Sequence, residues 1–234
     1  MVRAYLYLAV FIPLTCFFSA SALISSLFLA SDRCFAWHAR LWGKLALALN
    51  RVSVTISGVE HLPDGPVIFM SNHQSNFDIL ALLSLIPHQI YWIAKKELFE
   101  IPVFGPAMRR GGYIPLDRGN GRKALQSMDE AAATIQQGKS VVLFPEGTRS
   151  PDCDLLPFKR GGFILARKAG VPVIPVTING SGKINPASQI RLFSGSISIT
   201  IHPPVAVPEG LKRNEAENWM MSNVREQIES VLEH

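Results

Sequence analysis

Charge is scarce in this sequence, and the first part of the chain has almost none. Asp, Glu, Lys and Arg make up 18% of the 234 residues, below the roughly 25% of an average soluble protein. No charged residue occurs from Ala4 to Ser31. Because about 20 apolar residues are enough for a helix to cross a bilayer, the missing charge predicts a membrane-associated helical segment within residues 1–51.

Cysteine patterns and several catalytic motifs are absent as well. The three cysteines, at positions 16, 34 and 153, form no CxxC pair and no cluster with histidine, so we expect neither a disulfide framework nor a zinc site. The sequence has no G-x-S-x-G elbow and no HExxH helix, which argues against an α/β-hydrolase and against a zincin protease. From the cysteine pattern we expect the protein to lie in a reducing environment and to face the cytoplasm.

Three interpretations of the N-terminal segment are open. A cleaved signal peptide is disfavoured, because Arg3 is its only leading charge and the apolar run is longer than usual. A single transmembrane helix fits the length. A helical hairpin inside one leaflet fits as well, since Pro13 and several Ser and Thr residues can break or bend the run. Residues 32–51 mix Trp with Lys and Arg, which suits the headgroup zone and predicts a cytoplasmic flank; a buried core helix is the alternative.

After Arg51, short apolar runs alternate with helical patterns, which predicts one α/β domain over residues 52–234. Its central sheet is expected to be mostly parallel or mixed and covered by helices, because the central runs are apolar throughout. The predicted strands are 52–57, 67–70, 90–94, 112–116, 141–144, 171–178 and 196–202. The predicted helices are 76–85, 103–110, 122–137, 161–169 and 214–232.

The charge that is present is unevenly distributed. Residues 95–168 carry thirteen Lys and Arg against eight Asp and Glu, so the middle of the chain suits anionic partners such as phosphate groups or anionic lipid. Nucleic acid is not expected as a partner, since no run of basic residues interleaves with aromatic residues.

The first candidate site follows the predicted strand 67–70. His73 and Asp78 are five positions apart across a strand-to-helix turn, which is where α/β sheets place ligands. If the carboxylate meets the imidazole, it fixes the tautomer, and the other ring nitrogen can act as a general base. In the structural alternative, Asn72 or Ser75 caps the helix and His73 forms only local hydrogen bonds. These residues alone leave both interpretations open.

The second candidate site follows the predicted strand 141–144. A flexible backbone, a hydroxyl and a guanidinium come together in Glu146, Gly147, Thr148 and Arg149. Arginine suits bidentate contact with phosphate, so this loop predicts a phosphate site. The alternative is a surface loop with an internal Glu–Arg pair.

Further cations lie elsewhere in the middle of the chain. Lys159 and Arg160 directly precede a predicted helix, whose N-terminus is a natural anion site. A phosphate-binding groove beside an apolar wall is predicted from three more cations, Lys95, Lys96 and Arg118. The alternative for these three is a pair of loops around an amphipathic helix.

Taken together, four blocks resemble the glycerolipid acyltransferase family, and most of all its 1-acyl-sn-glycerol-3-phosphate acyltransferases. The blocks occur in the family's order as Asn72-His73-x-Ser75-x-x-Asp78, residues 112–118, Phe144-Pro145-Glu146-Gly147-Thr148-Arg149 and residues 171–176. The resemblance covers about residues 52–203. It favours the catalytic interpretation of the His–Asp pair over the structural one.

The resemblance implies a role for each candidate residue. His73 would deprotonate the free glycerol hydroxyl, which attacks an acyl thioester directly, and Asp78 would orient His73. Arg149 would bind the acceptor phosphate in a loop shaped by Glu146 and Gly147. The other residues assigned to substrate binding are Thr148, Arg118, Lys159 and one of the pair Lys95 and Lys96.

The resemblance also implies partners and a setting. The expected reaction converts lysophosphatidic acid to phosphatidic acid at a membrane, with acyl-CoA or acyl-carrier protein as donor and the catalytic domain facing the cytoplasm. A helix pair before the His block is typical of the family and favours the hairpin. No metal or cofactor is expected, because a thioester is already reactive. The rival hypotheses are another acceptor, such as glycerol 3-phosphate or a different lysophospholipid, a thioesterase, and a non-catalytic lipid-binding protein.

Overall fold

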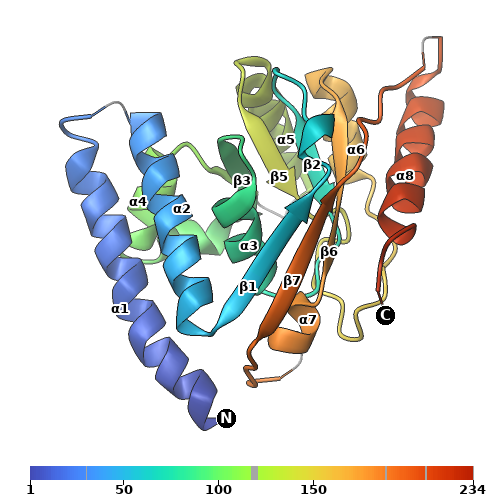
Figure 1. The fold of residues 1–234 in the computed structure, drawn as a ribbon. Coiled ribbons are helices and arrows are strands. Elements are labelled where there is room, and N and C mark those ends of the chain that lie inside the picture. Colours follow the sequence, from blue (N-terminus) through green and yellow to red (C-terminus); the bar gives the residue numbers. More distant parts are fainter. Residues whose placement is uncertain (30, 117–120, 188, 209, 234) are drawn as a thin grey trace.

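One mixed sheet forms the centre of the molecule (Figure 1). The computed structural model describes residues 1–29, 31–116, 121–187, 189–208 and 210–233, without the side chains of 31, 32 and 121–125. The sheet order is β1-β7-β6-β2-β5-β3-β4. β6 and β7 pair antiparallel, and the other neighbours pair in parallel. The strands are β1 (Val52–Ser57), β2 (Ile68–Ser71), β3 (Ile90–Lys95), β4 (Ile114–Leu116), β5 (Ser140–Leu143), β6 (Val173–Asn179) and β7 (Gly195–Ile201).

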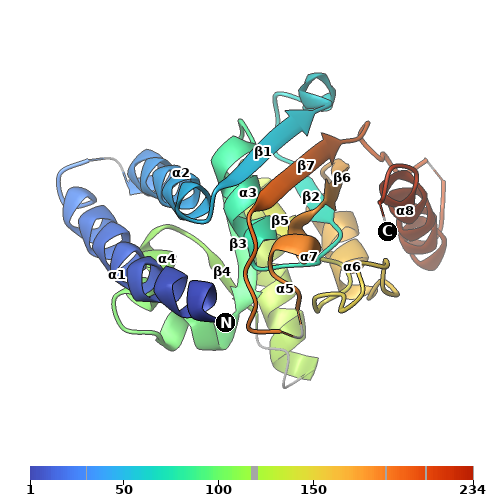
Figure 2. The same ribbon diagram turned by 60° about the horizontal axis from the view of Figure 1, so that its bottom comes forward.

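Helices cover both faces of this sheet. One layer contains α1 (Val2–Ser25), α2 (Ser31–Leu49) and α3 (Phe77–Leu85), and the other contains α5 (Gly121–Gln136), α6 (Gly161–Ala169) and α8 (Arg213–Glu229). Two shorter helices, α4 (Phe104–Arg110) and α7 (Ser181–Ile184), lie beside the sheet. Figure 2 shows α1 and α2 side by side at one end of the molecule and α8 at the other.

The central strands are mostly apolar because both of their faces are covered. Every residue of β2, β5 and β6 is buried. Side chains alternate between the two faces of a strand, and β2 follows this rule. Phe69 packs in the core under α1, α2 and α3, while Ile68 and Met70 pack in the core under α5, α6 and α8.

The N-terminal segment folds as a helical hairpin. α1 continues through Pro13 to Ser25, so the turn lies after Ser25 and not at the proline. By length and composition α1 can cross a membrane, with mean hydropathy 2.0 over its most apolar window. Thr15 joins the two helices, because its hydroxyl donates to the carbonyl of Phe11 and accepts from the indole nitrogen of Trp42 at 3.0 Å.

The predicted α/β architecture is confirmed. Each predicted strand and helix begins and ends within three residues of the corresponding boundary of an observed element. The short helix α7 and the 3-10 helices η1 (Val59–His61) and η2 (Lys96–Glu100) were not predicted. They are too short to show an apolar period. The proposed boundary between residues 1–51 and 52–234 coincides with the start of β1, but it stays an interpretation, because the hairpin packs directly on α3 and β1.

Candidate active site

The two predicted catalytic loops leave the same edge of the sheet. β2 and β5 are parallel neighbours, so their carboxyl ends lie together, where α/β sheets place ligands. The loop after β2 carries His73, and the loop after β5 contains residues 144–150. The amide of Ser150 donates to the carbonyl oxygen of His73 at 2.7 Å, which ties the two loops to each other.

His73 and Asp78 form the hydrogen bond predicted from their spacing. Nδ1 of His73 lies 2.8 Å from Oδ2 of Asp78. An ionised carboxylate only accepts, so Nδ1 carries the proton and Nε2 is left as an acceptor. The Asp78 side chain is fully buried, whereas 14% of the His73 side chain is exposed. The imidazole can therefore take a proton from a bound group while the buried carboxylate stabilises the imidazolium.

The backbone around the pair fixes the carboxylate. Oδ2 of Asp78 also accepts from the amides of Gln74 and Ser75 at 2.8 and 2.9 Å, which are donors left unpaired before the first turn of a helix. The amide of His73 donates to Glu146. Because these three amides are paired, they are not available to stabilise an oxyanion, a role for which amides near His73 would otherwise be the first choice.

Asn72 does not cap α3. Its side chain donates to the carbonyl oxygen and accepts from the amide of Ile178, both at 2.8 Å. Asn72 thus extends the pairing of β2 with β6 by one more residue and holds the His73 loop at the sheet edge. Ser75 does accept from the amide of Phe77 at 3.2 Å, so a structural cap and the His–Asp pair occur together.

Phe144 packs flat against His73. The two rings are 3.8 Å apart and inclined by 6°, and the indole of Trp92 stacks on Phe144 at 5.7 Å. This stack fixes the plane of the imidazole, while the bond to Asp78 fixes its rotation within that plane. The direction in which Nε2 points is therefore set before a ligand binds.

Glu146 supports the His73 loop from inside the protein. Only 2% of Glu146 is exposed; its Oε1 accepts the amide of His73 at 2.6 Å and its Oε2 the amide of Leu156 at 3.0 Å. Burial raises the pKa of Glu146 to about 7; the two amides and Arg225 oppose this rise, and the charge of Asp78 adds to it. Glu146 therefore positions the catalytic loop.

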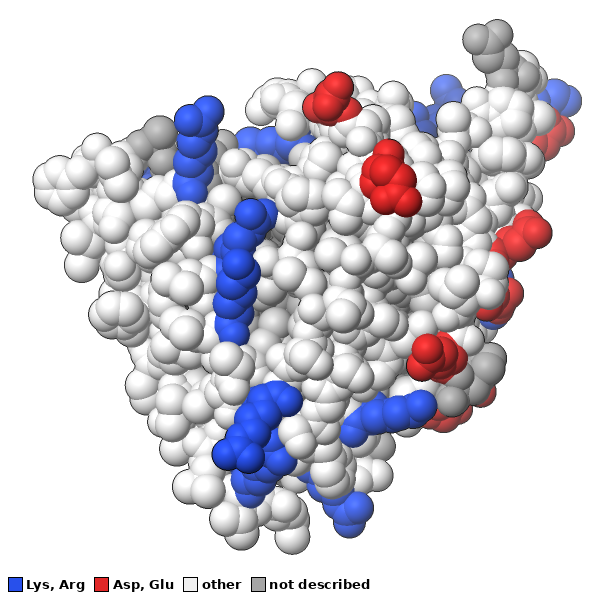
Figure 3. Space-filling view, viewed as in Figure 1, with Lys and Arg blue, Asp and Glu red and all other residues white. Residues whose placement is uncertain are grey.

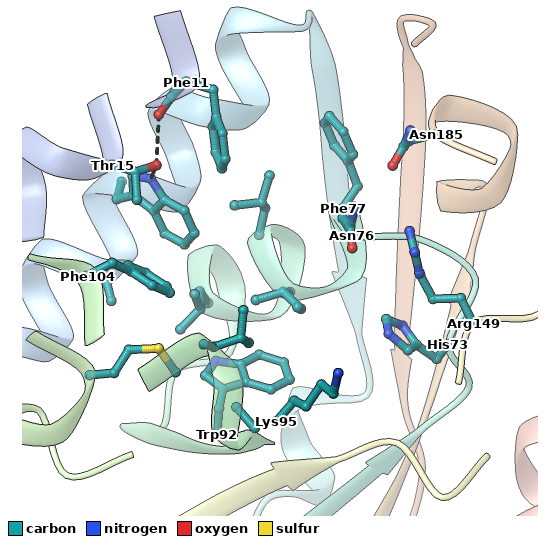
Figure 4. A pocket seen from close by; sticks show the side chains of 18 of the residues that line it. Phe11, Thr15, His73, Asn76, Phe77, Trp92, Lys95, Phe104, Arg149 and Asn185 are labelled. Atoms are coloured by element: carbon teal, nitrogen blue, oxygen red, sulfur yellow. Dashed lines mark hydrogen bonds between the residues drawn. The ribbon is translucent and has the colours of Figure 1, made fainter. Parts of the chain in front are cut away.

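A cavity of about 830 Å³ begins at His73 and extends under the N-terminal hairpin. Its walls come from α1, α2, α3, β3, α4, the loop after β5 and residues 185–187 and 189–192. Figure 4 shows His73 and Arg149 at one end, with aromatic and aliphatic side chains on the other walls. A mostly apolar space with convergent polar groups at one end suits an amphiphile.

The model of the acyltransferase family matches residues 53–179, which include both catalytic loops. This chain belongs to the acyltransferase family. The family resemblance inferred from the four sequence blocks is thereby confirmed.

Curated relatives of this chain agree in their description. The chloroplastic 1-acyl-sn-glycerol-3-phosphate acyltransferase of Brassica napus is 43% identical over 171 residues, 71% of this chain and 49% of the relative. An Arabidopsis thaliana enzyme of the same description is 38% identical over 194 residues, 82% and 53% of the two chains. The human alpha form is 36% identical over 165 residues, 70% and 58%. The chain spans about half the length of these relatives.

A solved structure shares nearly the whole fold of this chain. The crystal structure of a 1-acyl-sn-glycerophosphate (LPA) acyltransferase from Thermotoga maritima matches with a TM-score of 0.83 at 28% identity. The match covers 98% of this chain and 95% of that one. Because nearly the whole chain is covered, the likeness includes the N-terminal helix pair.

Four of the predicted substrate-binding residues line the cavity. Gly147, Thr148 and Arg149 lie beside His73, and Lys95 approaches from the end of β3 (Figure 4). The two neighbouring lysines differ in position. Lys95 lines the cavity, whereas Lys96 begins η2 and is not among the described residues that form the wall.

Lys159 lies over the backbone of Gly147. The glycine has φ 72°, and a Cβ there would come within 3.0 Å of Nζ and Cδ of Lys159. A side chain would be strained by this backbone angle and would also displace the lysine. The amide of Lys159 donates to the carbonyl of Pro145 at 2.8 Å, so the lysine is held beside the loop although it is not part of the cavity wall described here.

Of the other predicted cations, Arg160 lies away from the site. Arg160 turns away to α8, where its Nη2 lies 2.9 Å from Oε2 of Glu217, so it does not join the anion site predicted ahead of α6. Arg118 lies outside the described residues. Lys96 has its place in η2, as noted above.

Some side chains of the candidate site were not predicted from the sequence. Phe144 and Trp92 were assigned to buried strands, because an apolar residue at a strand end gives no sign that it will stack on a histidine. Residues 185–187 and 189–192 were not assigned to the site, although they line the cavity. This loop is anchored to the His73 loop, since the hydroxyl of Ser75 donates to the carbonyl of Asn185 at 3.0 Å.

Proposed function

We propose that this chain transfers a fatty acyl group from an acyl thioester to the free hydroxyl of 1-acyl-sn-glycerol 3-phosphate, forming phosphatidic acid. The observation that carries the proposal is the His73–Asp78 pair at the polar end of the apolar cavity, with Arg149 beside it. The descriptions of the plant, human and bacterial relatives support this choice of acceptor.

The tautomer of His73 determines which ring nitrogen acts as the base in the proposed reaction. The acceptor hydroxyl donates its hydrogen to Nε2, and this proton moves to the ring as the oxygen attacks the thioester carbon. Asp78 stabilises the imidazolium through Nδ1. The tetrahedral intermediate then collapses with cleavage of the carbon–sulfur bond, and the thiolate takes the proton from Nε2. Holding both reactants in one cavity supplies much of the rate. Because the thioester is already activated, we propose that no metal or cofactor takes part.

Arg149 is proposed to bind the acceptor phosphate. It lines the cavity beside His73, and its guanidinium can form two parallel hydrogen bonds with phosphate oxygens. Lys95 supplies a second positive charge from β3, and its Nζ lies 3.4 Å from Glu97 on an exposed surface, where the ion pair is weak enough to exchange for a phosphate. The acyl thioester comes from acyl-CoA or acyl-carrier protein, and nucleic acid is not a proposed partner.

The hairpin is proposed to lie in one leaflet, with the catalytic domain on the cytoplasmic side. The outer face of α1 is apolar and exposed, as at Leu6, Ile12 and Phe17, and so large a patch marks a membrane surface. The inner face of α1 lines the cavity, so a crossing that pulled α1 off the domain would remove a cavity wall. Figure 3 shows Lys and Arg side chains following α2, which suits anionic headgroups and a cytoplasmic orientation.

Acyl transfer from radiolabelled acyl-CoA to lysophosphatidic acid tests the proposed function. The wild type in detergent or liposomes should form phosphatidic acid, and His73→Ala should not. Fatty acid released at the same rate with and without acceptor would identify a thioesterase instead. Absence of product from a folded wild type with both acyl-CoA and acyl-carrier-protein donors would contradict the proposed acceptor, and glycerol 3-phosphate and other lysophospholipids would then be compared.

A further inference from the structure

α8 lies outside the range matched by the family model and far from the N-terminal hairpin (Figure 1). Its Arg225 nevertheless reaches the loop that leads away from the active site. Nη1 of Arg225 donates to the carbonyl of Leu156 at 3.1 Å, and Nη2 donates to the carbonyl of Leu155 at 3.2 Å. One guanidinium thus holds two consecutive peptide groups.

The same loop continues the connection to the catalytic base. The amide of Leu156 donates to Oε2 of Glu146 at 3.0 Å, and Oε1 of Glu146 accepts the amide of His73 at 2.6 Å. Arg225 is therefore joined to the backbone of His73 through one peptide group and one carboxylate. Glu146 is buried, so water cannot easily replace either of these hydrogen bonds.

Arg225 is itself held in place on the protein. Its guanidinium lies 5.5 Å from the ring centroid of Phe158, and Phe158 stacks on Phe163 of α6 at 6.0 Å. α8 is also attached to α6 independently, because Glu217 accepts from Arg167 at 2.9 Å. This second attachment does not touch residues 155–158, so the two functions of α8 can be separated by mutation.

We propose that Arg225 is a positioning residue for the reaction, which acts by holding the 155–158 loop and a positive charge against Glu146 and thereby keeps His73 in place. The proposal rests on the assignment of His73 as the base. Arg225 touches neither substrate nor reacting atoms. It acts on the base through Glu146.

The contact between Arg225 and the loop beside Glu146 should affect the pKa of Glu146, which can be measured. The charged groups that bear on Glu146 are Asp78, which raises its pKa, and Arg225, which lowers it. The ionised carboxylate can accept both amides, whereas a protonated one has a hydroxyl facing one of the two donors. Without Arg225, the pKa of Glu146 rises further, and a larger fraction of molecules lose one of these bonds at neutral pH.

The test compares Arg225→Ala with Arg167→Ala in the full chain. Both variants remove one guanidinium that attaches α8 to the rest of the protein, but Arg167 does not contact the loop. We expect Arg225→Ala to lower kcat about tenfold at pH 7, to move the acid limb of the pH profile to higher pH and to recover activity toward pH 9. Arg167→Ala should keep the wild-type profile, and Arg225→Lys should restore part of the shift.

Two further measurements test whether Arg225 acts through Glu146, and they distinguish a failure of this inference from a failure of the proposed function. In a Glu146→Gln background, Arg225→Ala should cause no additional shift; a shift that persists there, or an equal shift in Arg167→Ala, overturns the proposal. Hydrogen exchange needs no activity, and Arg225→Ala should lose protection in residues 72–76 and 146–158 while Arg167→Ala does not. Unchanged protection in Arg225→Ala overturns the inference even if transfer is confirmed. If the wild type has no transferase activity but Arg225→Ala still loses this protection, only the proposed function is contradicted.

Discussion

Glu146 accepts the backbone amide of His73 at 2.6 Å, across 73 positions of sequence. The hydrogen bond joins the loop that carries the proposed base to the loop that carries the proposed phosphate-binding arginine. Because both loops leave neighbouring parallel strands, a change in one is expected to alter the geometry of the other.

Replacing Asp78 by Asn tests whether Asp78 keeps the proton of neutral His73 on Nδ1. The amide can still accept from the backbone donors, but it cannot stabilise an imidazolium, and its NH2 group disfavours a proton on Nδ1 of His73. We expect kcat to fall about a thousandfold or more, with little change in either KM. Steady-state kinetics measures this loss, and thermal unfolding controls for stability. A folded variant that keeps more than a tenth of wild-type kcat would speak against the pair as the catalytic unit.

Replacing Arg149 by Ala tests the acceptor site. Loss of a charge-assisted contact with phosphate should raise the acceptor KM by about 10- to 100-fold, and the donor KM should stay close to the wild-type value. Arg149→Lys keeps the charge without the planar fork and should give an intermediate value. The measurement varies lysophosphatidic acid at a fixed saturating donor. Unchanged acceptor kinetics in Arg149→Ala would remove this residue from the phosphate site.

Replacing Phe144 by Leu tests the ring stacked on His73. Leucine fills most of the same volume but offers no flat surface 3.8 Å from the imidazole. Since a stacked aromatic pair contributes about 0.5–1.5 kcal/mol, we expect kcat to fall between about twofold and tenfold, and Phe144→Tyr to retain nearly full activity. An equal effect of both substitutions would show that volume matters here and the stack does not.

Glu146 is expected to make stability depend on pH. Burial raises its pKa to about 7 in the folded protein, above the usual 4.5, so the folded state binds this proton more tightly than the unfolded state. Its contribution is fully present below about pH 4.5 and is lost as the pH rises through 7. Chemical unfolding from pH 4.5 to 8 should show this component in the wild type and not in Glu146→Gln. Parallel curves for the two proteins would contradict it.

His202 is expected to act in the opposite direction. The Thr177 hydroxyl donates to the carbonyl of Ile228 at 3.0 Å, so it must accept from Nε2 of His202 at 2.8 Å. Burial lowers the pKa of His202, and the charge of His61 lowers it further. The stability from this group is present above about pH 6.5 and is lost as the pH falls through the folded pKa. His202→Gln keeps a donor to Thr177, so Tm should fall less between pH 7.5 and 5.5 in this variant than in the wild type.

The sheet could be predicted from the sequence because its central strands are buried on both faces. Uninterrupted apolar runs such as residues 141–144 exist for that reason, and their ends also located the catalytic loops. The spacing of His73 and Asp78 made their hydrogen bond one of two open interpretations, since both flank a single turn, and the family resemblance favoured it.

The cavity could not be predicted in the same way. α1 is apolar on every side, so no period distinguishes Tyr7 and Phe18, which line the cavity, from Leu6 and Phe17, which are exposed. Nor does the sequence around Arg160 show that its partner is Glu217, because that contact depends on where α8 returns to the sheet.

α1 has one face in the cavity and the other on the outside of the protein, so in the proposed membrane setting the same helix would touch both the ligand space and the lipid. A truncated chain that starts at β1 would therefore be a poor soluble substitute for the whole protein, because it would lack a wall of its own cavity. A detergent that covers α1 during purification would support that wall from behind. Kinetic constants measured in one detergent then describe the protein together with that detergent, and values for a native bilayer have to be measured in one.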